Sequence, residues 1–437
     1  MALTEKKKYG LWTASAFVVA NMIGTGVFTS LGFQLEATEN FIAILILWAI
    51  GGVIALCGAM SYGELGALFP HSGGEYFYLG HIYSPVVGFL AGWVSLVVGF
   101  AAPVALASMA LASYIDQLVP GIPPEVISIG VLTVITVIHA FTLHVSGVAQ
   151  NILTWLKVAV IIVFIILGLT VPTHLESIRP SVTGFEWKTI FSAPFAVSII
   201  WVYYAYSGWN ASAYIANDIE KPQKTLPGSL LLSTLGVTVI YMLLNLVFLL
   251  TAPVAEMKGQ VEIGLISAGH ILGERMGTAM GLVIAFMLVS SISSMVFIGP
   301  RVSQAMGEEH RMLRFLRVKT RNGIPIVGLL FQYALSVIMI LTGSFSLVTR
   351  YTGVLLSLSS MMAVLGVIVC RFTRKKMARP FKSPLYPVPQ IIFILLMLVS
   401  VVYSVASDWK VLAVSAGTLC GGVLLFYVEK IIFARKS

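Results

Sequence analysis

Two short stretches of helix-weakening residues interrupt runs of the sequence that are otherwise apolar. One is IGTGVF at 23–28 and the other is YSGWNAS at 206–212. Glycine lowers the stability of a helix by about 1 kcal/mol relative to alanine, and Ser, Thr and Asn offer the backbone competing local hydrogen bonds. In the hydrocarbon layer an unwound backbone is tolerated only where it faces protein or a watery cavity. The two stretches therefore predict a pair of broken membrane-spanning helices around one polar site.

A broken helix presents free N–H groups at the start of one half and free carbonyls at the end of the other. The N–H groups attract a carboxylate and the carbonyls attract an ammonium. A zwitterionic α-amino acid carries both groups on one carbon, so two facing breaks can hold it without a charged side chain. We assign the N–H groups of Thr25 and Gly26, with the Thr25 hydroxyl, to the carboxylate. The carbonyls of Met22, Tyr204 and Ala205 are then expected to receive the ammonium.

The glycines of the first stretch have an alternative explanation, which is close packing between helices. Small residues four positions apart are common at helix interfaces in membranes. Gly24 and Gly26 are only two positions apart, which puts them on different faces of a helix. That spacing favours an unwound segment, and the matching break at 207–210 supports the same interpretation.

Lys157 is the only basic residue that falls at the depth of a predicted span. It lies about ten residues into that span, which at 1.5 Å per residue is about 15 Å, near the middle of a hydrocarbon core about 30 Å thick. A cation at that depth is costly unless it faces a cavity or a partner. A lysine that snorkels toward the inner face is the alternative. We favour a functional Lys157, which could gain and lose a proton as the helices move.

Three further polar residues are candidates for the same machinery. Ser293 and Ser294 belong to the cluster SSISS at 290–294 and could face Lys157, although serines also pack helices together. Asp218 lies where the sixth predicted span ends, and it is expected either to form an inner-gate ion pair or to be solvated.

Two glutamates lie near the inner end of the second predicted span and in the loop that follows it. Glu64 and Glu75 are interpreted as structural or gate groups. A direct role in proton transfer is the alternative.

The composition places these groups in a membrane. Of the 437 residues, 58% are hydrophobic and 10% are charged, and the mean hydropathy is +0.94, whereas about a quarter of an average soluble domain is charged. About twelve apolar stretches of about 22 residues would account for about 60% of the chain. We therefore expect an all-α membrane protein with 12 transmembrane helices, packed as a single domain over 1–437. The predicted spans are 10–35, 41–69, 85–115, 125–145, 147–171, 189–218, 228–251, 277–304, 324–344, 347–370, 387–406 and 409–432.

The basic residues are distributed unequally between the two sides of these spans. The chain has 27 Lys and Arg against 18 Asp and Glu, a net charge of +9. With the N-terminus inside, 20 of the basic residues fall inside and six outside. Because basic residues concentrate on the cytoplasmic side of membrane proteins, this asymmetry predicts that both termini are cytoplasmic. The basic clusters are then expected to contact lipid headgroups, and no nucleic-acid partner is expected.

The sequence carries no signature of an enzyme, a cofactor or a metal site. Cys57, Cys370 and Cys420 lie far apart in apolar runs, so neither a disulfide framework nor a zinc site is expected. A phosphate loop of the form G-x-x-x-x-G-K-[ST] and an H-E-x-x-H motif are both absent. We expect a protein that is not an enzyme and that needs no cofactor.

Several motifs resemble those of the amino acid, polyamine and organocation (APC) superfamily, in an order and spacing that agree over residues 10 to about 305. They are IGTGVF at 23–28, YGEL at 62–65, PHSGGEYFY at 70–78, YAYSGWN at 204–210 and EKPQKTLP at 220–227. The fourth motif is most similar to the heteromeric-type and bacterial L-type amino acid permeases of that superfamily.

The resemblance implies an architecture and a mode of action. The expected fold is a 5+5 inverted repeat with broken helices 1 and 6, followed by two C-terminal helices. The first repeat would span 10–171, the second 189–370, and the two extra helices 387–432. Such a bundle is expected to work by alternating access.

The resemblance also implies roles for single residues of this sequence. Thr25 and Gly26 match positions that bind the substrate carboxylate, and Gly24 matches the hinge glycine at the same site. Tyr204 matches an aromatic gate that closes over the substrate from the extracellular side. Ser207 belongs to the predicted substrate site and replaces a glycine that is common in this branch.

Lys157 resembles a lysine of sodium-independent members of the superfamily. Its ammonium would stand in for a sodium ion between spans one and eight. The resemblance therefore implies that no sodium is required.

These observations predict a secondary transporter of neutral L-amino acids in the plasma (inner) membrane, working either as a proton symporter or as an exchanger. No acidic residue lies near 204–210 in the sequence to pair with a cationic side chain. An amine or polyamine permease is the alternative, but its ligand lacks the carboxylate that the first break would bind. A non-transporting amino acid receptor is a further alternative. The expected partners are an amino acid, membrane lipid and, for a symporter, protons.

Overall fold

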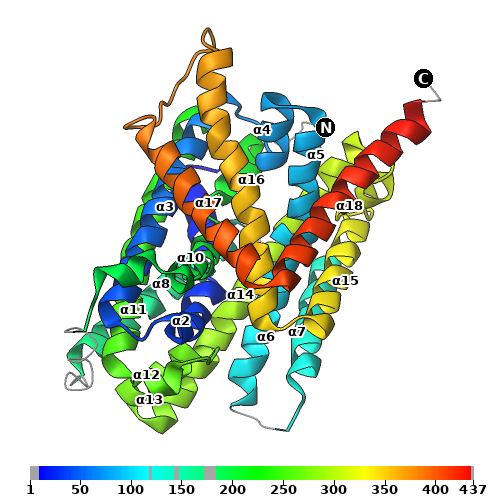
Figure 1. The fold of residues 1–437 in the computed structure, drawn as a ribbon. Helices are drawn as coiled ribbons and strands as arrows, with labels where there is room; N and C mark the ends of the chain where they lie inside the picture. Colours follow the sequence, from blue (N-terminus) through cyan, green and yellow to red (C-terminus); the bar gives the residue numbers. More distant parts are fainter. Residues whose placement is uncertain (1–8, 118–120, 142–146, 172–183, 435–437) are drawn as a thin grey trace.

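The computed structural model describes residues 9–117, 121–141, 147–171 and 184–434, and this part of the chain is a bundle of helices without a β-strand (Figure 1). An isolated bridge joins Tyr9 to Ile219. Some of the basic residues used to predict the topology lie outside the described residues; they are Lys6, Lys7, Lys8, Arg179, Arg435 and Lys436.

Ten helices of the described chain are long and apolar enough to cross a membrane. The sixth and ninth predicted spans coincide with shorter helices, α10 and α15. The predicted all-helical membrane class is thus confirmed. The helices that follow the predicted spans are α1 (Leu11–Met22), α2 (Thr25–Ala37), α3 (Phe41–Leu68), α5 (Pro85–Val94), α6 (Ala101–Asp116), α7 (Pro124–Phe141), α8 (Gly147–Thr170), α10 (Ala193–Tyr206), α11 (Pro222–Thr251), α14 (Glu274–Glu309), α15 (Ile326–Thr342), α16 (Phe345–Thr373), α17 (Val388–Ser407) and α18 (Trp409–Ala434). Shorter helices connect them, namely α4 (Glu75–Ile82), α12 (Val254–Met257) and α13 (Ile263–Leu272).

The first span is broken where the glycines predict it. Helix α1 ends at Met22 and α2 begins at Thr25. Gly24 has φ −132° and ψ −145°, far from helical values, and Ile23 has ψ 87°. The chain therefore leaves the helix for two residues and starts it again.

The sixth span is broken in the same way. Helix α10 ends at Tyr206, and Ser207 is extended with ψ 153°. Gly208 follows with φ +96°, a left-handed conformation that favours glycine. The chain then continues as a 3-10 helix, η3 (Ala211–Asp218). Both predicted breaks are present.

The third span contains a local irregularity that the sequence analysis did not predict. A π-helical turn, η1 (Ser95–Gly99), separates α5 from α6. Pro103 has no N–H to donate to the carbonyl of Gly99, and a proline in a helix interior disturbs the preceding turn. π-Helical turns of this kind often lie at functional sites.

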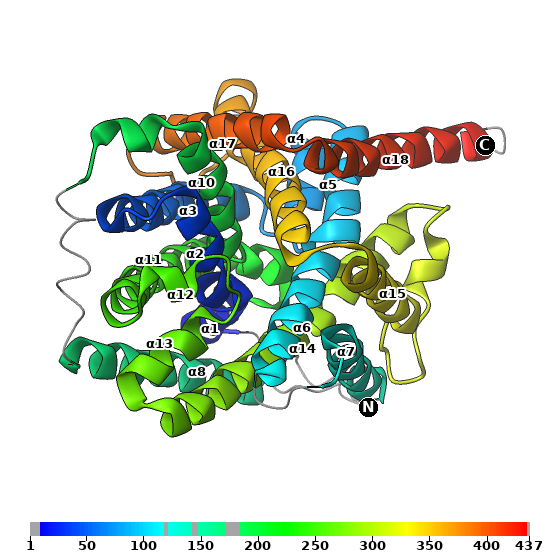
Figure 2. The same cartoon turned by 60° about the horizontal axis from the view of Figure 1, so that its bottom comes forward.

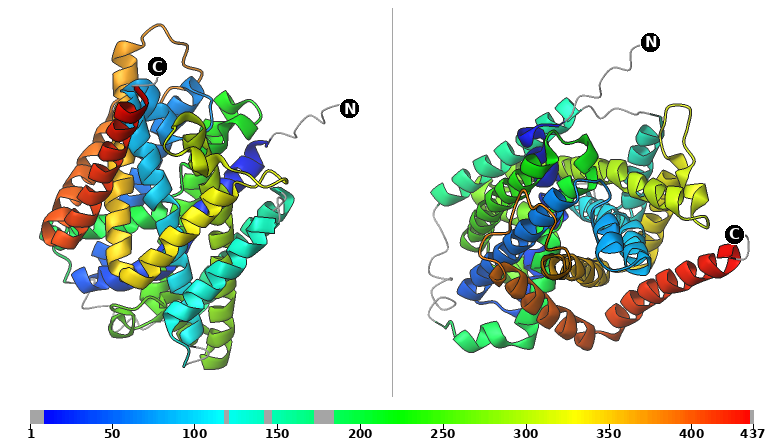
Figure 3. Two further views of the ribbon diagram at one scale, coloured as in Figure 1. Left: turned by 90° about the vertical axis from the view of Figure 1, so that its right-hand side faces the viewer. Right: turned by 90° about the horizontal axis from the view of Figure 1, so that it is seen from above.

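The helices form two groups around the breaks. Helix α3 packs along α11, α2 packs against α10, and α14 packs against α6. Figure 2 shows α1, α2, α3, α10 and α11 gathered on one side and α6, α7, α14 and α15 on the other. Helices α17 and α18 follow one edge of the bundle, and the end of α18 projects away from it (Figures 2 and 3). The breaks therefore lie inside, where packed helices surround them.

Glu64 ties the end of α3 to the end of α16 and to the chain that follows it. Its side chain is 1% exposed. Arg371 donates to both of its carboxylate oxygens, at 2.9 and 2.6 Å, and the backbone N–H of Ser383 donates at 2.7 Å. This geometry supports a structural role for Glu64 at the end of the bundle that also carries α4.

Candidate functional site

The two broken segments touch each other because glycines allow their backbones to approach. A Cβ on Gly26 would lie 2.3 Å from the Cα of Ala205, and a Cβ on Gly208 would lie 2.8 Å from the backbone carbon of Asn21. Gly26 therefore serves close packing as well as the break. The second half of the first span thus contacts the first half of the sixth, and the break of the sixth span contacts the first half of the first.

One small cavity lies between the breaks, and its lining brings together all seven residues that the sequence analysis assigned to the substrate. They are Met22, Gly24, Thr25, Gly26, Tyr204, Ala205 and Ser207. Asn21, Pro103, Ala107, Ser291 and Met295 complete the wall. Of these five, Pro103 lies one turn beyond the π-helical segment, so the irregular third span also contributes to the site.

The donors expected for a carboxylate are at the start of α2. The N–H groups of the first turn of a helix, here those of Thr25 and Gly26, have no partner within it. The Thr25 hydroxyl lies 3.2 Å from the Tyr204 hydroxyl, and both side chains are buried. This contact connects the donor end of the first break to the end of α10.

Two of the three carbonyls expected for an ammonium have a common partner. The hydroxyl of Tyr241, on α11, lies 2.5 Å from the Met22 carbonyl oxygen and 3.1 Å from that of Ala205. The Tyr204 carbonyl accepts the Ser207 N–H at 3.0 Å. Tyr241 thus bridges the two breaks. Sequence reasoning missed it, and the only signal available was a hydroxyl in the middle of an apolar span.

Lys157 contacts the first break directly. Its side chain is buried, and its Nζ donates to the Ile23 carbonyl and to the Ser291 hydroxyl, both at 2.9 Å. The Ser291 hydroxyl itself lies 3.3 Å from the Ile23 carbonyl. A carbonyl left free by the break therefore accepts from a buried ammonium and from α14.

The two serines named as partners of Lys157 lie elsewhere on α14. Ser293 lies 2.8 Å from Nε2 of His139, on α7. Ser294 is buried, and no contact with Lys157 is recorded for it within the described residues. The structure therefore brings Ser291, and not Ser293, to the Lys157 ammonium.

Asp218 lies at the end of the second half of the sixth span. Its backbone carbonyl accepts the Tyr9 N–H at 2.7 Å, and the Glu220 N–H donates to the Tyr9 carbonyl at 2.9 Å. Its carboxylate also interacts electrostatically with Arg301 of α14. The start of the first span and the end of the sixth are thus joined at one end of the bundle.

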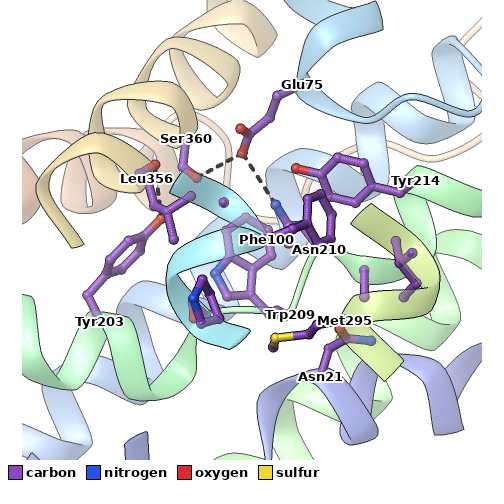
Figure 4. A pocket seen from close by; sticks show the side chains of 16 residues that line it. Asn21, Glu75, Phe100, Tyr203, Trp209, Asn210, Tyr214, Met295, Leu356 and Ser360 are labelled. Atoms are coloured by element: carbon purple, nitrogen blue, oxygen red, sulfur yellow. Dashed lines mark hydrogen bonds between the residues drawn. The ribbon is translucent and has the colours of Figure 1, made fainter. Parts of the chain in front are cut away.

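Glu75 lies next to the second break, although 131 positions along the chain separate it from Tyr206. Its carboxylate accepts from the Asn210 side chain at 3.3 Å and from the Ser360 hydroxyl at 3.1 Å (Figure 4). Tyr62 also donates to it. The sequence premise that no acidic residue lies near 204–210 is therefore wrong in three dimensions, because α4 folds back against the break.

Comparisons with known proteins assign the chain a family. The family model described as amino acid permease matches residues 9–424. The chain is 27% identical over 431 residues to b(0,+)-type amino acid transporter 1 of Mus musculus, covering 97% of this chain and 87% of that protein. It is 26% identical to Asc-type amino acid transporter 1 of Mus musculus, over 97% of this chain and 81% of that protein. The cystine/glutamate transporter of Pongo abelii is 26% identical, over 87% of this chain and 77% of that protein.

Replacing Gly208 tests whether the contact between the breaks constrains the fold. Gly208→Ala puts a Cβ at a positive φ and against the Asn21 backbone, which should cost about 1–3 kcal/mol of stability. We expect a lower midpoint of thermal unfolding in detergent. Gly236→Ala is the matched control, because that helical glycine of α11 has open space around it. Its midpoint should stay the same or rise, and equal midpoints for both variants would contradict the account.

Proposed function

The chain belongs to the amino acid permease family, and from that premise we propose that it carries neutral L-amino acids across a membrane by alternating access, without sodium. It is a multi-pass membrane protein. The unequal distribution of its basic residues supports cytoplasmic termini, and we propose the plasma (inner) membrane as its location. Transport would be driven by proton symport or by exchange of amino acids.

The observation that carries this proposal is the cavity between the two breaks. Its wall offers the first-turn N–H groups of α2 on one side and the carbonyls of Met22 and Ala205 on the other. These groups complement a carboxylate and an ammonium on the same carbon. The Ala205 carbonyl oxygen has two lone pairs, so an ammonium can bind there beside the Tyr241 hydroxyl. The Met22 oxygen already accepts from the Gly24 N–H and from Tyr241, so an ammonium would replace one of these two donors. An amine without a carboxylate would leave the N–H groups of the first break unpaired.

The sodium-independent part of the proposal rests on Lys157. The ammonium lies between α1 and α14 and donates to a carbonyl and a hydroxyl, which are oxygen ligands that a cation would otherwise use. The amine can also release its proton. The same group is therefore suited either to a fixed positive charge or to proton coupling.

Two contacts support the proposed gates. The Tyr204 hydroxyl lies against the Thr25 hydroxyl in the wall of the cavity. Asp218 takes part in the backbone pairing with Tyr9 at one end of the bundle. For a substrate to enter or leave the cavity at either end of the bundle, the contact at that end would have to separate. We further propose that 10–171 and 189–370 are the two inverted repeats and that 387–432 are the two extra helices, since each repeat would begin with a broken helix.

Replacing Lys157 tests the coupling role. Lys157→Met removes the ammonium donor from the Ile23 carbonyl and leaves that carbonyl only the Ser291 hydroxyl at 3.3 Å. A lost hydrogen bond to a charged group costs about 1.5–3 kcal/mol, equivalent to about tenfold or more in rate or affinity. We expect sodium-free uptake of labelled alanine into proteoliposomes to fall at least about tenfold, with or without an imposed proton gradient or trans-loaded alanine. Lys410→Ala, at an exposed lysine, is the control. Wild-type rates in Lys157→Met would contradict the role.

Replacing Tyr241 tests whether its hydroxyl holds the two breaks in register. Tyr241→Phe keeps the ring and removes the bond to the Met22 and Ala205 carbonyls. A lost hydrogen bond of this kind costs about 1 kcal/mol, so the KM for alanine should rise about fivefold. Tyr206→Phe is the matched control, because its buried hydroxyl bonds to the Trp48 carbonyl instead of to a break. Equal KM values for the two variants would argue against the bridging role.

A further inference from the structure

A second cavity adjoins the one between the breaks. The two share Asn21, Pro103, Ser207 and Met295 as lining residues. A ligand that leaves the first cavity on this side therefore meets the second. Its lining includes Glu75, the first residue of α4, and Tyr214 of η3. Ile219, which pairs with Tyr9, directly follows η3.

The Glu75 carboxylate belongs to this second cavity and is not satisfied as an anion. Its side chain is 2% exposed. All three of its recorded donors, on Tyr62, Ser360 and Asn210, bond to the same oxygen, Oε1. Within the described residues no hydrogen bond to Oε2 is recorded, and no Lys, Arg or His forms an ion pair with this side chain. One carboxylate oxygen is thus held and the other is available.

The remaining wall is suited to a cation. Four aromatic rings line the cavity beside Glu75, those of Phe100, Tyr203, Trp209 and Tyr214 (Figure 4). Ring faces attract cations, and the attraction grows when the cation is desolvated. Helix α4 lies outside the candidate spans, and burial raises the pKa of Glu75 because it disfavours the charged form. A bound cation would stabilise the ionised carboxylate.

We propose that this cavity, the Glu75 cavity, is a second binding site that takes an ammonium group, with Oε2 of Glu75 as its acceptor. The inference rests on the proposed function. Two sources supply the same chemistry. One is the α-ammonium of a neutral amino acid on its way between the breaks and the adjacent side of the membrane. The other is the side-chain ammonium of a lysine-like amino acid whose carboxylate stays at the first break.

The test uses Glu75→Gln in the full chain, reconstituted in proteoliposomes. Glutamine keeps an oxygen that accepts from the three donors and removes the charge. We expect the KM for alanine offered from the Glu75 side to rise about tenfold, because a hydrogen bond to a charged group contributes about 1.5–3 kcal/mol. The KM from the opposite side and the maximal rate should be unchanged. Glu262→Gln is the matched control, since this buried carboxylate bonds to Ser113 far from the cavity, and both of its KM values should equal those of the wild type.

The outcomes separate the two sources from a failed inference. A one-sided rise in KM for alanine identifies the α-ammonium. Lysine transport by the wild type that Glu75→Gln abolishes, with alanine unchanged, identifies a side-chain ammonium. Unchanged KM values for both substrates, a loss from both sides alike, or a loss confined to proton-driven uptake overturns the ammonium site.

A second variant tests the inference even if Glu75→Gln does not fold. Phe100→Leu removes one ring from the wall and leaves the Glu75 hydrogen bonds in place. It should raise the same one-sided KM by a smaller factor, and an unchanged KM overturns the inference. Absence of amino acid uptake by the unmodified protein would instead overturn the proposed function, and this inference with it.

Discussion

A buried ammonium on the free carbonyl of a broken helix is the contact on which the rest of the site depends. The break leaves the Ile23 carbonyl without a helical partner, and an unpaired polar group in hydrocarbon costs several kcal/mol. Lys157 donates to that carbonyl and is itself stable at this depth only because such acceptors are present. Each group thus lowers the free-energy cost of burying the other. The contact joins α8 to the break, and the Ser291 hydroxyl extends it to α14.

The two breaks then act as one unit because three different contacts connect them. Gly26 and Gly208 allow backbone to touch backbone, the Tyr241 hydroxyl lies between two carbonyls, and the Thr25 and Tyr204 hydroxyls meet above the cavity. The resulting pocket offers main-chain groups of both breaks. In the proposed function these groups would recognise the part that all α-amino acids share, and the surrounding wall would select the side chain.

The sequence predicts those features that local composition determines. The breaks follow from glycines and hydroxyls within apolar runs, and the depth of Lys157 follows from counting residues. Tyr241 was not named, and Glu75 was named only as a structural or gate group, because their contacts with the breaks depend on which spans lie side by side. The sequence could not single out the serine of the 290–294 cluster that contacts Lys157, for a related reason. Ser291 and Ser293 are two residues apart, about 200° around a helix, so only the rotation of α14 decides which of them faces Lys157.

The most direct test of the central claim is a cryo-electron microscopy structure of the reconstituted protein with bound alanine and no sodium. The account predicts density in the cavity between the breaks, with the carboxylate within hydrogen-bond distance of the Thr25 and Gly26 N–H groups. The ammonium should lie near the Met22 and Ala205 carbonyls, while Lys157 still contacts Ile23. Density for alanine outside this cavity, or its carboxylate bonded to Lys157, would contradict the account.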